Sequence, residues 1–207
     1  MSDIRVRIAP SPTGQLHVGT ARAALFNYLF AKNQGGIFIV RIEDTDKERS
    51  KKEFETDILD SLEWLGIAAD ESPRTGGEYG PYRQSERTET HTRFLIRLLD
   101  MENAFYCFHS QGELAEEREA RKKGKKSPIH VCDYRNESKE EQNVHLRSRK
   151  THVIRFKTPA GREVVFRDHI RGEVKFQSDE LGDFSIAKEI TEPLYNFAAA
   201  IDDSLMH

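Results

Sequence analysis

The sequence has 207 residues, of which 37% are hydrophobic and 32% are charged, and its formal net charge is −3. This composition is typical of a globular protein with a buried core, and it argues against attraction of the whole protein to nucleic acid. The two cysteines exclude a disulfide scaffold, and no membrane-length apolar run or signal segment occurs, so we expect a cytoplasmic protein.

The first predicted elements form a strand, helix, strand unit. Residues 4–8 alternate apolar side chains with arginines in a short strand, and the turn residues 10–14 end it. Apolar residues at helical spacing predict a helix over 18–31, and the near-continuous apolar run 36–42 predicts a strand covered on both faces. This alternation favours the α/β class, with a doubly wound, Rossmann-like parallel sheet.

The rest of the chain predicts further helices and a group of short strands. An amphipathic helix at 54–65 and a turn-rich segment at 70–82 come before a helix at 85–101. The later predicted elements are a strand at 105–108, a polar helix at 113–122, strands at 153–157, 163–168 and 173–176, and a helix at 193–205. Short alternating strands beside helices predict an inserted α+β domain.

The middle of the chain is cationic. From Arg118 to Arg155 there are twelve lysines and arginines against five acidic residues, so this stretch carries +7 and the remainder −10. Such a segment can contact phosphates, since neutralising them releases counterions. For the run 121–126 alone, a solvated loop is an equal alternative.

The loop between the first strand and the first helix has the features of an anion site. Gly14 and Gly19 have the outer spacing of a P-loop, but Thr20 stands where that motif requires lysine. A helix N-terminus still presents free N–H groups, Gly19 allows close approach, and His17 can donate to a phosphate oxygen. The alternative role of His17 is that of a helix cap or a packing residue.

Three blocks in order, RIAPSPTGQLHVGT, FIVRIEDTD and GGEYGPYRQSER, resemble the catalytic domain of the glutamyl-tRNA synthetases, which are class I aminoacyl-tRNA synthetases. The segment His17–Thr20 is similar to the ATP-binding "HIGH" signature of that class. The resemblance runs from Ile4 to Met206 and is thin between Gly112 and Thr151.

The resemblance implies ATP-dependent formation of glutamyl adenylate and transfer of glutamate to the 3′ end of tRNA(Glu), with Mg²⁺ on the phosphates. His17 and Thr20 are then the expected catalytic residues. The residues expected to bind ATP are Pro12, Gly14, His17, Gly19 and Thr20. The residues expected to bind L-glutamate are Arg7, Ala9, Ser11, Glu43 and Tyr195. Arginine suits the side-chain carboxylate, and an anion such as Glu43 suits the amino group.

The resemblance also divides the chain into three parts: a first half of the catalytic domain at 1–88, an inserted tRNA-acceptor-binding domain at 89–190, and the start of the second, truncated half at 191–207. Arg147, Arg149, Lys150 and Arg155 of the insertion are the residues expected to contact phosphates. We expect a monomer.

One element of the family pattern is missing, because the sequence has no "KMSKS" lysine loop. We therefore expect a fragment that also lacks the anticodon-binding domain, with very weak ATP–pyrophosphate exchange. Two alternatives stay open: the paralogue that glutamylates the queuosine base of a tRNA, and a non-catalytic acceptor-binding module. The YGPYRQSER block favours the synthetase over the paralogue. The sequence does not say whether tRNA for glutamine is also charged.

Two short clusters contain candidate zinc ligands. They are Cys107, His109, His130, Cys132 and Tyr134. Some members of the family bind zinc through a Cys-x-Cys pair and a second pair downstream, which by position implies Cys107, His109, Cys132 and Tyr134 here. His109 and Tyr134 depart from that pattern. The alternative is a core strand at 105–108 with a buried free thiol.

Overall fold

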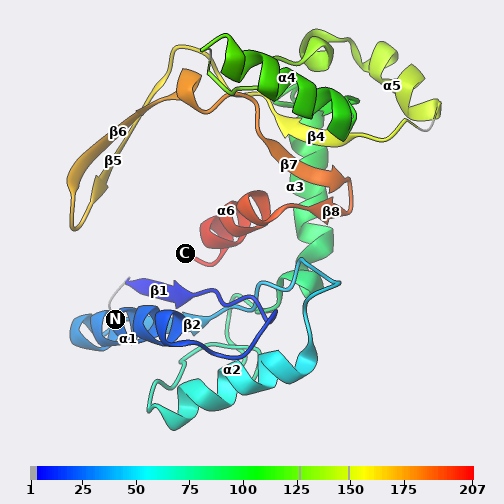
Figure 1. Ribbon diagram of the computed structural model, residues 1–207. Helices are drawn as coiled ribbons and strands as arrows, with labels where there is room; N and C mark the ends of the chain where they lie inside the picture. Colours follow the sequence, from blue (N-terminus) through cyan, green and yellow to red (C-terminus); the bar gives the residue numbers. More distant parts are fainter. Residues whose placement is uncertain (1–3, 126, 149) are drawn as a thin grey trace. The chain divides into compact units, whose positions relative to one another are not determined.

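The computed structural model describes residues 4–125, 127–148 and 150–207. Two compact units are present, one comprising the chain up to His91 together with Tyr195–His207, and the other comprising Thr92–Leu194 (Figure 1). Among the described residues, no helix is long and apolar enough to cross a membrane.

The first unit is built on a parallel strand pair. Strand β1 (Arg5–Ile8) pairs with β2 (Ile37–Val40), and helix α1 (Val18–Gln34) connects them. Helix α2 (Lys52–Trp64) follows. Single parallel bridges join the end of this pair to Glu71 and Arg83. The parallel core is confirmed, whereas a larger doubly wound sheet stays a prediction.

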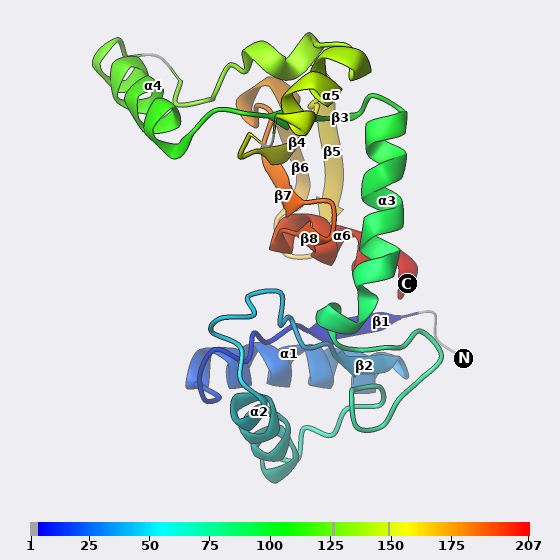
Figure 2. The ribbon, with the colours of Figure 1, turned by 90° about the vertical axis from the view of Figure 1, so that its right-hand side faces the viewer.

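Alternation along the strands directs side chains to two different layers. Phe38 and Val40 face α1 and α2 and pack with their apolar residues, while Ile39 packs with Tyr82 and Met206 on the opposite face. Strand β2 is thus covered on both faces, as its apolar run predicts. Figures 1 and 2 show α1 and α2 beneath the strand pair and helix α6 (Tyr195–Leu205) above it.

A buried carboxylate fastens α6 to the segment that follows the strand pair. Asp202 is fully buried and accepts hydrogen bonds from Arg87 Nε at 2.6 Å, His91 Nε2 at 2.8 Å and Gln84 Nε2 at 3.0 Å. Gln84 and Arg87 belong to a 3-10 turn, η1 (Gln84–Arg87), and His91 to helix α3 (Thr88–Asp100). Two parts of the chain that are distant in sequence are therefore joined within the first unit.

The second unit contains an antiparallel sheet in the order β3-β4-β7-β8. Its strands are β3 (Ala104–Cys107), β4 (Val153–Phe156), β7 (Ser185–Glu189) and β8 (Glu192–Pro193). The hairpin of β5 (Glu163–Asp168) and β6 (Gly172–Gln177) forms a separate sheet (Figure 1). The helical segments are α4 (Gln111–Lys123), η2 (Asp133–Asn136), α5 (Lys139–Arg147) and η3 (Ser178–Glu180).

Most predicted elements of the second unit are confirmed within a few residues, and three were missed. These are α5, β7 and β8. Helix α5 carries a recognisable start signal, a capping box in which Ser138 and Glu141 satisfy each other's backbone N–H groups. The single helix predicted over 85–101 is instead the turn η1 followed by α3.

Candidate active site and candidate metal centre

The loop after β1 places His17 over the first turn of α1. Its Nδ1 accepts from the backbone N–H of Thr20 at 3.3 Å, and its Nε2 lies 3.0 Å from the Thr20 hydroxyl. A Cβ at Gly19 would lie 3.1 Å from the imidazole ring, so glycine leaves room for this position. His17 is therefore a helix cap, and the neutral ring with Nδ1 as acceptor carries its proton on Nε2.

The loop is held in place by backbone hydrogen bonds to later segments. The carbonyl of Pro10 accepts from Glu43 N at 3.0 Å, and that of Pro12 accepts from Lys51 N at 2.9 Å. The N–H of Leu16 donates to Asp57 Oδ2 at 2.9 Å. A cavity of about 510 Å³ results beside the helix N-terminus. Its lining includes Ala9, Ser11, Gly14, His17, Gly19 and Thr20.

Four charged side chains form a row on the α6 side of the strands. Asp203 accepts from Arg7 through Nε and Nη2, each at 2.7 Å, and from Arg41 Nη1 at 2.7 Å. Arg41 in turn donates through Nη2 to Glu43 at 3.1 Å. Arg41 and Glu43 are almost fully buried, while Asp203 is half-exposed. Cations and anions alternate along this row, so each charge has an opposite neighbour.

The charges of this row shift the pKa values of Glu43 and Arg7. Burial raises the pKa of Glu43, although the hydrogen bond from Arg41 and the charge of Arg7 oppose this. The pKa of Arg7 is raised, first by its hydrogen bond with Asp203 and further by the charges of Glu43 and Tyr195. Asp203 and Arg41 thus connect the guanidinium of Arg7 to the buried carboxylate of Glu43, and these two groups suit a ligand with both carboxylate and ammonium groups.

The residues predicted to bind substrates are divided between two cavities. Arg7 lines a cavity of about 280 Å³ with Arg41 and Asp203, whereas Ala9 and Ser11 line the cavity of about 510 Å³. Pro12 is buried and is not part of either lining. Asp203 and Arg41 were missed, since Asp203 is 196 residues from Arg7 in sequence. The only available signal was the alternation that directs Arg7 to one face of β1.

The second unit brings four cysteine and histidine side chains together. The donor atoms of Cys107, His109, His130 and Cys132 all lie within 4.8 Å of one another. Cys107 Sγ is 3.6 Å from His109 Nδ1 and 3.7 Å from His130 Nε2, and Cys132 Sγ is 3.7 Å from His109 Nδ1. A hydrogen bond from Cys132, with others from Arg155 and His109, lowers the pKa of the Cys107 thiol against the effect of burial.

The other predicted residues of this unit have different surroundings. The ring of Tyr134 lies edge-on to that of His109, with centroids 5.0 Å apart. Arg155 is buried and donates to the Asp183 carbonyl at 2.8 Å, so the expectation of an outward phosphate contact is wrong for this residue. Arg147 and Lys150 are exposed, and Arg149 lies outside the described residues.

The chain is similar to known proteins. The family model of the class I tRNA synthetases (E and Q), catalytic domain, matches residues 3–207. The glutamate–tRNA ligase of Carboxydothermus hydrogenoformans is 49% identical over 203 residues, which are 98% of this chain and 42% of that protein. The Bacillus subtilis glutamate–tRNA ligase is 48% identical over 205 residues, with 99% and 42% covered.

A solved structure has the same fold. It is a glutamate tRNA ligase from Elizabethkingia meningosepticum in complex with its amino acid, with a TM-score of 0.87 and 40% identity, and the match covers 98% of this chain and 42% of that one. The chain thus spans less than half the length of these relatives. On the match over residues 3–207 and these identities, the chain belongs to the class I tRNA synthetases for glutamate and glutamine, within their catalytic domain.

Proposed function

We propose that this chain is the part of a glutamate–tRNA ligase that binds ATP and L-glutamate and supports formation of glutamyl adenylate. The observation that carries the proposal is the cavity of about 510 Å³, whose lining includes Ala9 and Ser11 near one end of the loop and His17, Gly19 and Thr20 at the other. In this proposal the loop after β1 contacts both substrates, and Arg7 lies within β1 just before that loop.

The ATP phosphates lie at the start of α1 in this proposal. Its first N–H groups and the helix dipole favour an anion there. The Nε2–H of His17, which meets the Thr20 hydroxyl at 3.0 Å, donates to a phosphate oxygen instead when the nucleotide binds. These groups position the α-phosphate for in-line attack by the substrate carboxylate and stabilise the charge that develops. Mg²⁺ on the phosphates is implied by the family.

Glutamate lies against the row of charges. The bonds to Asp203 use Nε and Nη2 of Arg7, which leaves Nη1 as its donor without a partner among the described residues. That donor takes the side-chain carboxylate, and Glu43 takes the ammonium group. Tyr195, which is half-exposed, completes the pocket from α6.

Titration calorimetry with glutamate and with a non-hydrolysable ATP analogue tests both assignments. Arg7→Ala removes a charge-assisted hydrogen bond worth about 1.5–3 kcal/mol, so glutamate affinity falls roughly 10- to 100-fold while ATP affinity is kept. His17→Ala weakens the ATP analogue and leaves glutamate unchanged. Arg22→Ala, an exposed arginine on α1, is the matched control. Unchanged affinities in the first two variants would refute the site.

The partner implied by this function is tRNA(Glu), with the second unit at its acceptor end. The ligase names of the relatives support this function over a queuosine-modifying paralogue. The exposed Arg147 and Lys150 are the remaining described candidates for phosphate contacts. The roles of the three ranges 1–88, 89–190 and 191–207, the cytoplasmic location and the monomeric state stay predictions.

We further propose that the Cys/His cluster binds zinc through Cys107, His109, His130 and Cys132. Tetrahedral zinc with bonds of about 2.3 Å to sulfur and about 2.0–2.1 Å to nitrogen separates the two kinds of ligand by roughly 3.6 Å. The sulfur–nitrogen distances of 3.6–3.7 Å support this geometry. His130 thus replaces Tyr134 in the ligand set. With four protein ligands, the ion would have a structural role.

Elemental analysis and chelator competition test the metal. We expect about one zinc per chain, lost in Cys107→Ser and kept in Tyr134→Phe. Zinc retained by Cys107→Ser, or a folded wild-type protein that takes up none, would rule the site out.

A further inference from the structure

Helix α4 depends on very few contacts with the rest of its unit. It has 13 residues and none of them is buried. Isolated helices of this length are marginal in water, so α4 needs contacts beyond its own hydrogen bonds. Its half-buried face consists of Leu114, Glu117 and Arg121, of which two are charged.

Glu117 makes polar contacts that connect α4 to His130 of the Cys/His cluster and to its neighbour Val131. One carboxylate oxygen accepts from His130 Nδ1, and the other accepts from the backbone N–H of Val131 at 3.1 Å. Arg121, one turn later, donates to the carbonyl of Ser127 at 2.8 Å. Ser127 follows α4 closely in sequence, so among the described residues it is Glu117 that provides the polar link from α4 to the Cys/His cluster.

His130 is the connecting group, because its two ring nitrogens face different partners. Nε2 lies 3.7 Å from Cys107 Sγ, on the side of the cluster, while Nδ1 is bonded to Glu117. A carboxylate on the outer nitrogen fixes the tautomer of a metal-bound histidine and raises its basicity. The effect is mutual, because a metal bound to Nε2 fixes the orientation of the imidazole ring and so fixes the Nδ1 donor that the Glu117 carboxylate accepts from.

We propose that Glu117 is a positioning residue that couples metal occupancy of the Cys/His cluster to the docking of helix α4. This inference rests on the proposed zinc site and goes beyond it. Metal on His130 Nε2 holds the imidazole so that Nδ1 donates to Glu117, and this bond holds the helix. Without metal the ring is free to turn, and α4 loses its main polar contact.

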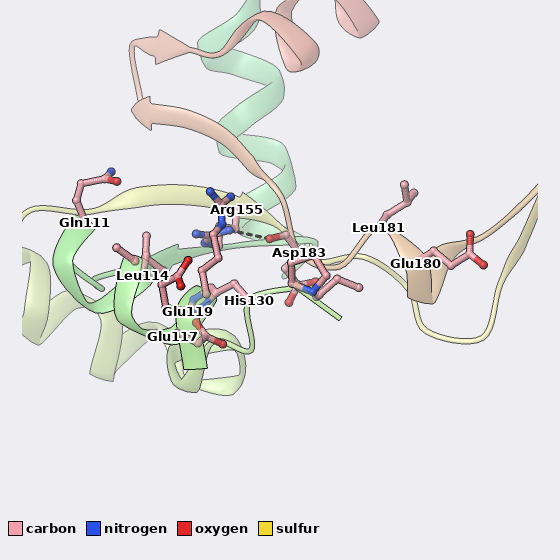
Figure 3. Close-up of a pocket in the computed structure, with 13 residues that line it drawn as sticks. Gln111, Leu114, Glu117, Glu119, His130, Arg155, Glu180, Leu181 and Asp183 are labelled. Atoms are coloured by element: carbon pink, nitrogen blue, oxygen red, sulfur yellow. Dashed lines mark hydrogen bonds and ion pairs between the residues drawn. The ribbon is translucent and has the colours of Figure 1, made fainter. Parts of the chain in front are cut away.

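A neighbouring cavity depends on this coupling. It has a volume of about 600 Å³, and α4 supplies Gln111, Leu114 and other residues to its wall, with His130 and Arg155 among the rest. Figure 3 shows Glu117 and His130 together at this wall and Arg155 bonded to Asp183 across from them. Undocking of α4 would open the cavity. It would also release the basic end of the helix, Arg121 to Lys123.

Two measurements on the full 207-residue chain test the coupling. Chelator competition gives zinc affinity, which we expect to fall about 10- to 100-fold in Glu117→Gln, as is usual for outer-shell carboxylates. Hydrogen–deuterium exchange gives the protection of α4 amides. We expect it to fall when zinc is removed from the wild type, and in Glu117→Gln even at saturating zinc. Glu116→Gln, an exposed neighbour on the same helix, should match the wild type in both.

The amides of β4 and β7 report whether the unit remains folded, so a loss of protection confined to α4 identifies undocking. If the wild type binds zinc but its α4 amides exchange equally fast with and without the metal, the coupling is overturned and the zinc site is still supported. Unchanged zinc affinity in Glu117→Gln would overturn the positioning role. A folded protein that binds no zinc would remove both proposals.

Discussion

The substitution Asp202→Asn tests the buried carboxylate that fastens α6. Asparagine has the same shape as aspartate but no charge, so the change removes an anion and leaves packing intact. Arg87 Nε and His91 Nε2 both donate to Oδ1, which an asparagine carbonyl can replace. Gln84 Nε2 donates to Oδ2. In the variant the NH₂ group of the asparagine replaces Oδ2, so two hydrogen-bond donors would face each other.

The magnitude follows from which contacts can adapt. Gln84 Oε1 is buried and has no hydrogen-bond partner within the described part of the chain, so a flip of the Gln84 amide brings Oε1 to the NH₂ group of the new asparagine and restores that hydrogen bond. Arg87 and Arg41 have no comparable way to compensate, because both guanidinium groups are buried beside the carboxylate that loses its charge. The Asp202 carboxylate lies 2.6 Å from Arg87 Nε and 4.0 Å from Arg41 Nε. Breaking a buried pair from one side costs about 3–5 kcal/mol, and we expect the lower end. That is roughly 6–12 °C in melting temperature for a chain of this size.

Thermal and urea unfolding followed by circular dichroism, at pH 7 and at pH 3, measures both the loss and its pH dependence. Burial by itself raises the pKa of Asp202, but hydrogen bonds from His91 and Arg87 outweigh this and lower it. A lowered pKa in the folded state gives stability that is present above the unfolded value of about 3.9 and is lost as pH falls through the folded pKa. The difference in the free energy of unfolding between wild type and Asp202→Asn therefore becomes smaller towards pH 3.

The matched control is Asp60→Asn. Asp60 is also ion-paired, to Arg74 at 2.5 Å, but it is exposed, so we expect a loss of about 0–1 kcal/mol. Two outcomes would show that the buried charge does not hold α6 in place. One is an equal loss of stability in Asp202→Asn and Asp60→Asn, and the other is a stability difference between wild type and Asp202→Asn that is the same at pH 7 and pH 3.

Three further substitutions test other features. Gly36→Ala would place a Cβ 2.4 Å from the Ile4 carbonyl oxygen, so we expect urea unfolding to show a loss of about 1–3 kcal/mol. Gly19→Ala would crowd the His17 ring at 3.1 Å, and calorimetry should show roughly fivefold weaker ATP binding with little change in stability. Ser110→Ala removes the capping box of α4 at a cost of about 1 kcal/mol, which faster hydrogen exchange confined to that helix would report.

The local elements could be predicted because their signals are local. Residues 4–8 and 36–42 carry the apolar patterns of strands, and the observed β1 and β2 lie inside them. Strands β7 and β8 were missed, because β8 has only two residues and β7 pairs around a bulge. Such short strands form through their neighbours in the sheet and leave little pattern of their own.

Of the candidate site, sequence motifs identify the part that lies on the loop after β1. His17 and its neighbours lie on one continuous loop, so a single motif identifies them. Asp203 and Glu117 were not identified, because each acts through a residue of another segment: Arg7 for Asp203 and His130 for Glu117. An acidic residue on a helix has no sequence signal that separates an ion-pair partner from a solvated charge.

The bond between His91 and Asp202 has a consequence for how this chain tolerates change. His91 is the last residue of the first unit before Thr92–Leu194 begins, and Asp202 lies just beyond its end. The first unit is thus closed by contacts between its own two chain segments, on either side in sequence of residues 92–194. Because each doubling of a connecting loop costs only about 0.6 kcal/mol, segments of different length or sequence could be exchanged at this point as a cassette.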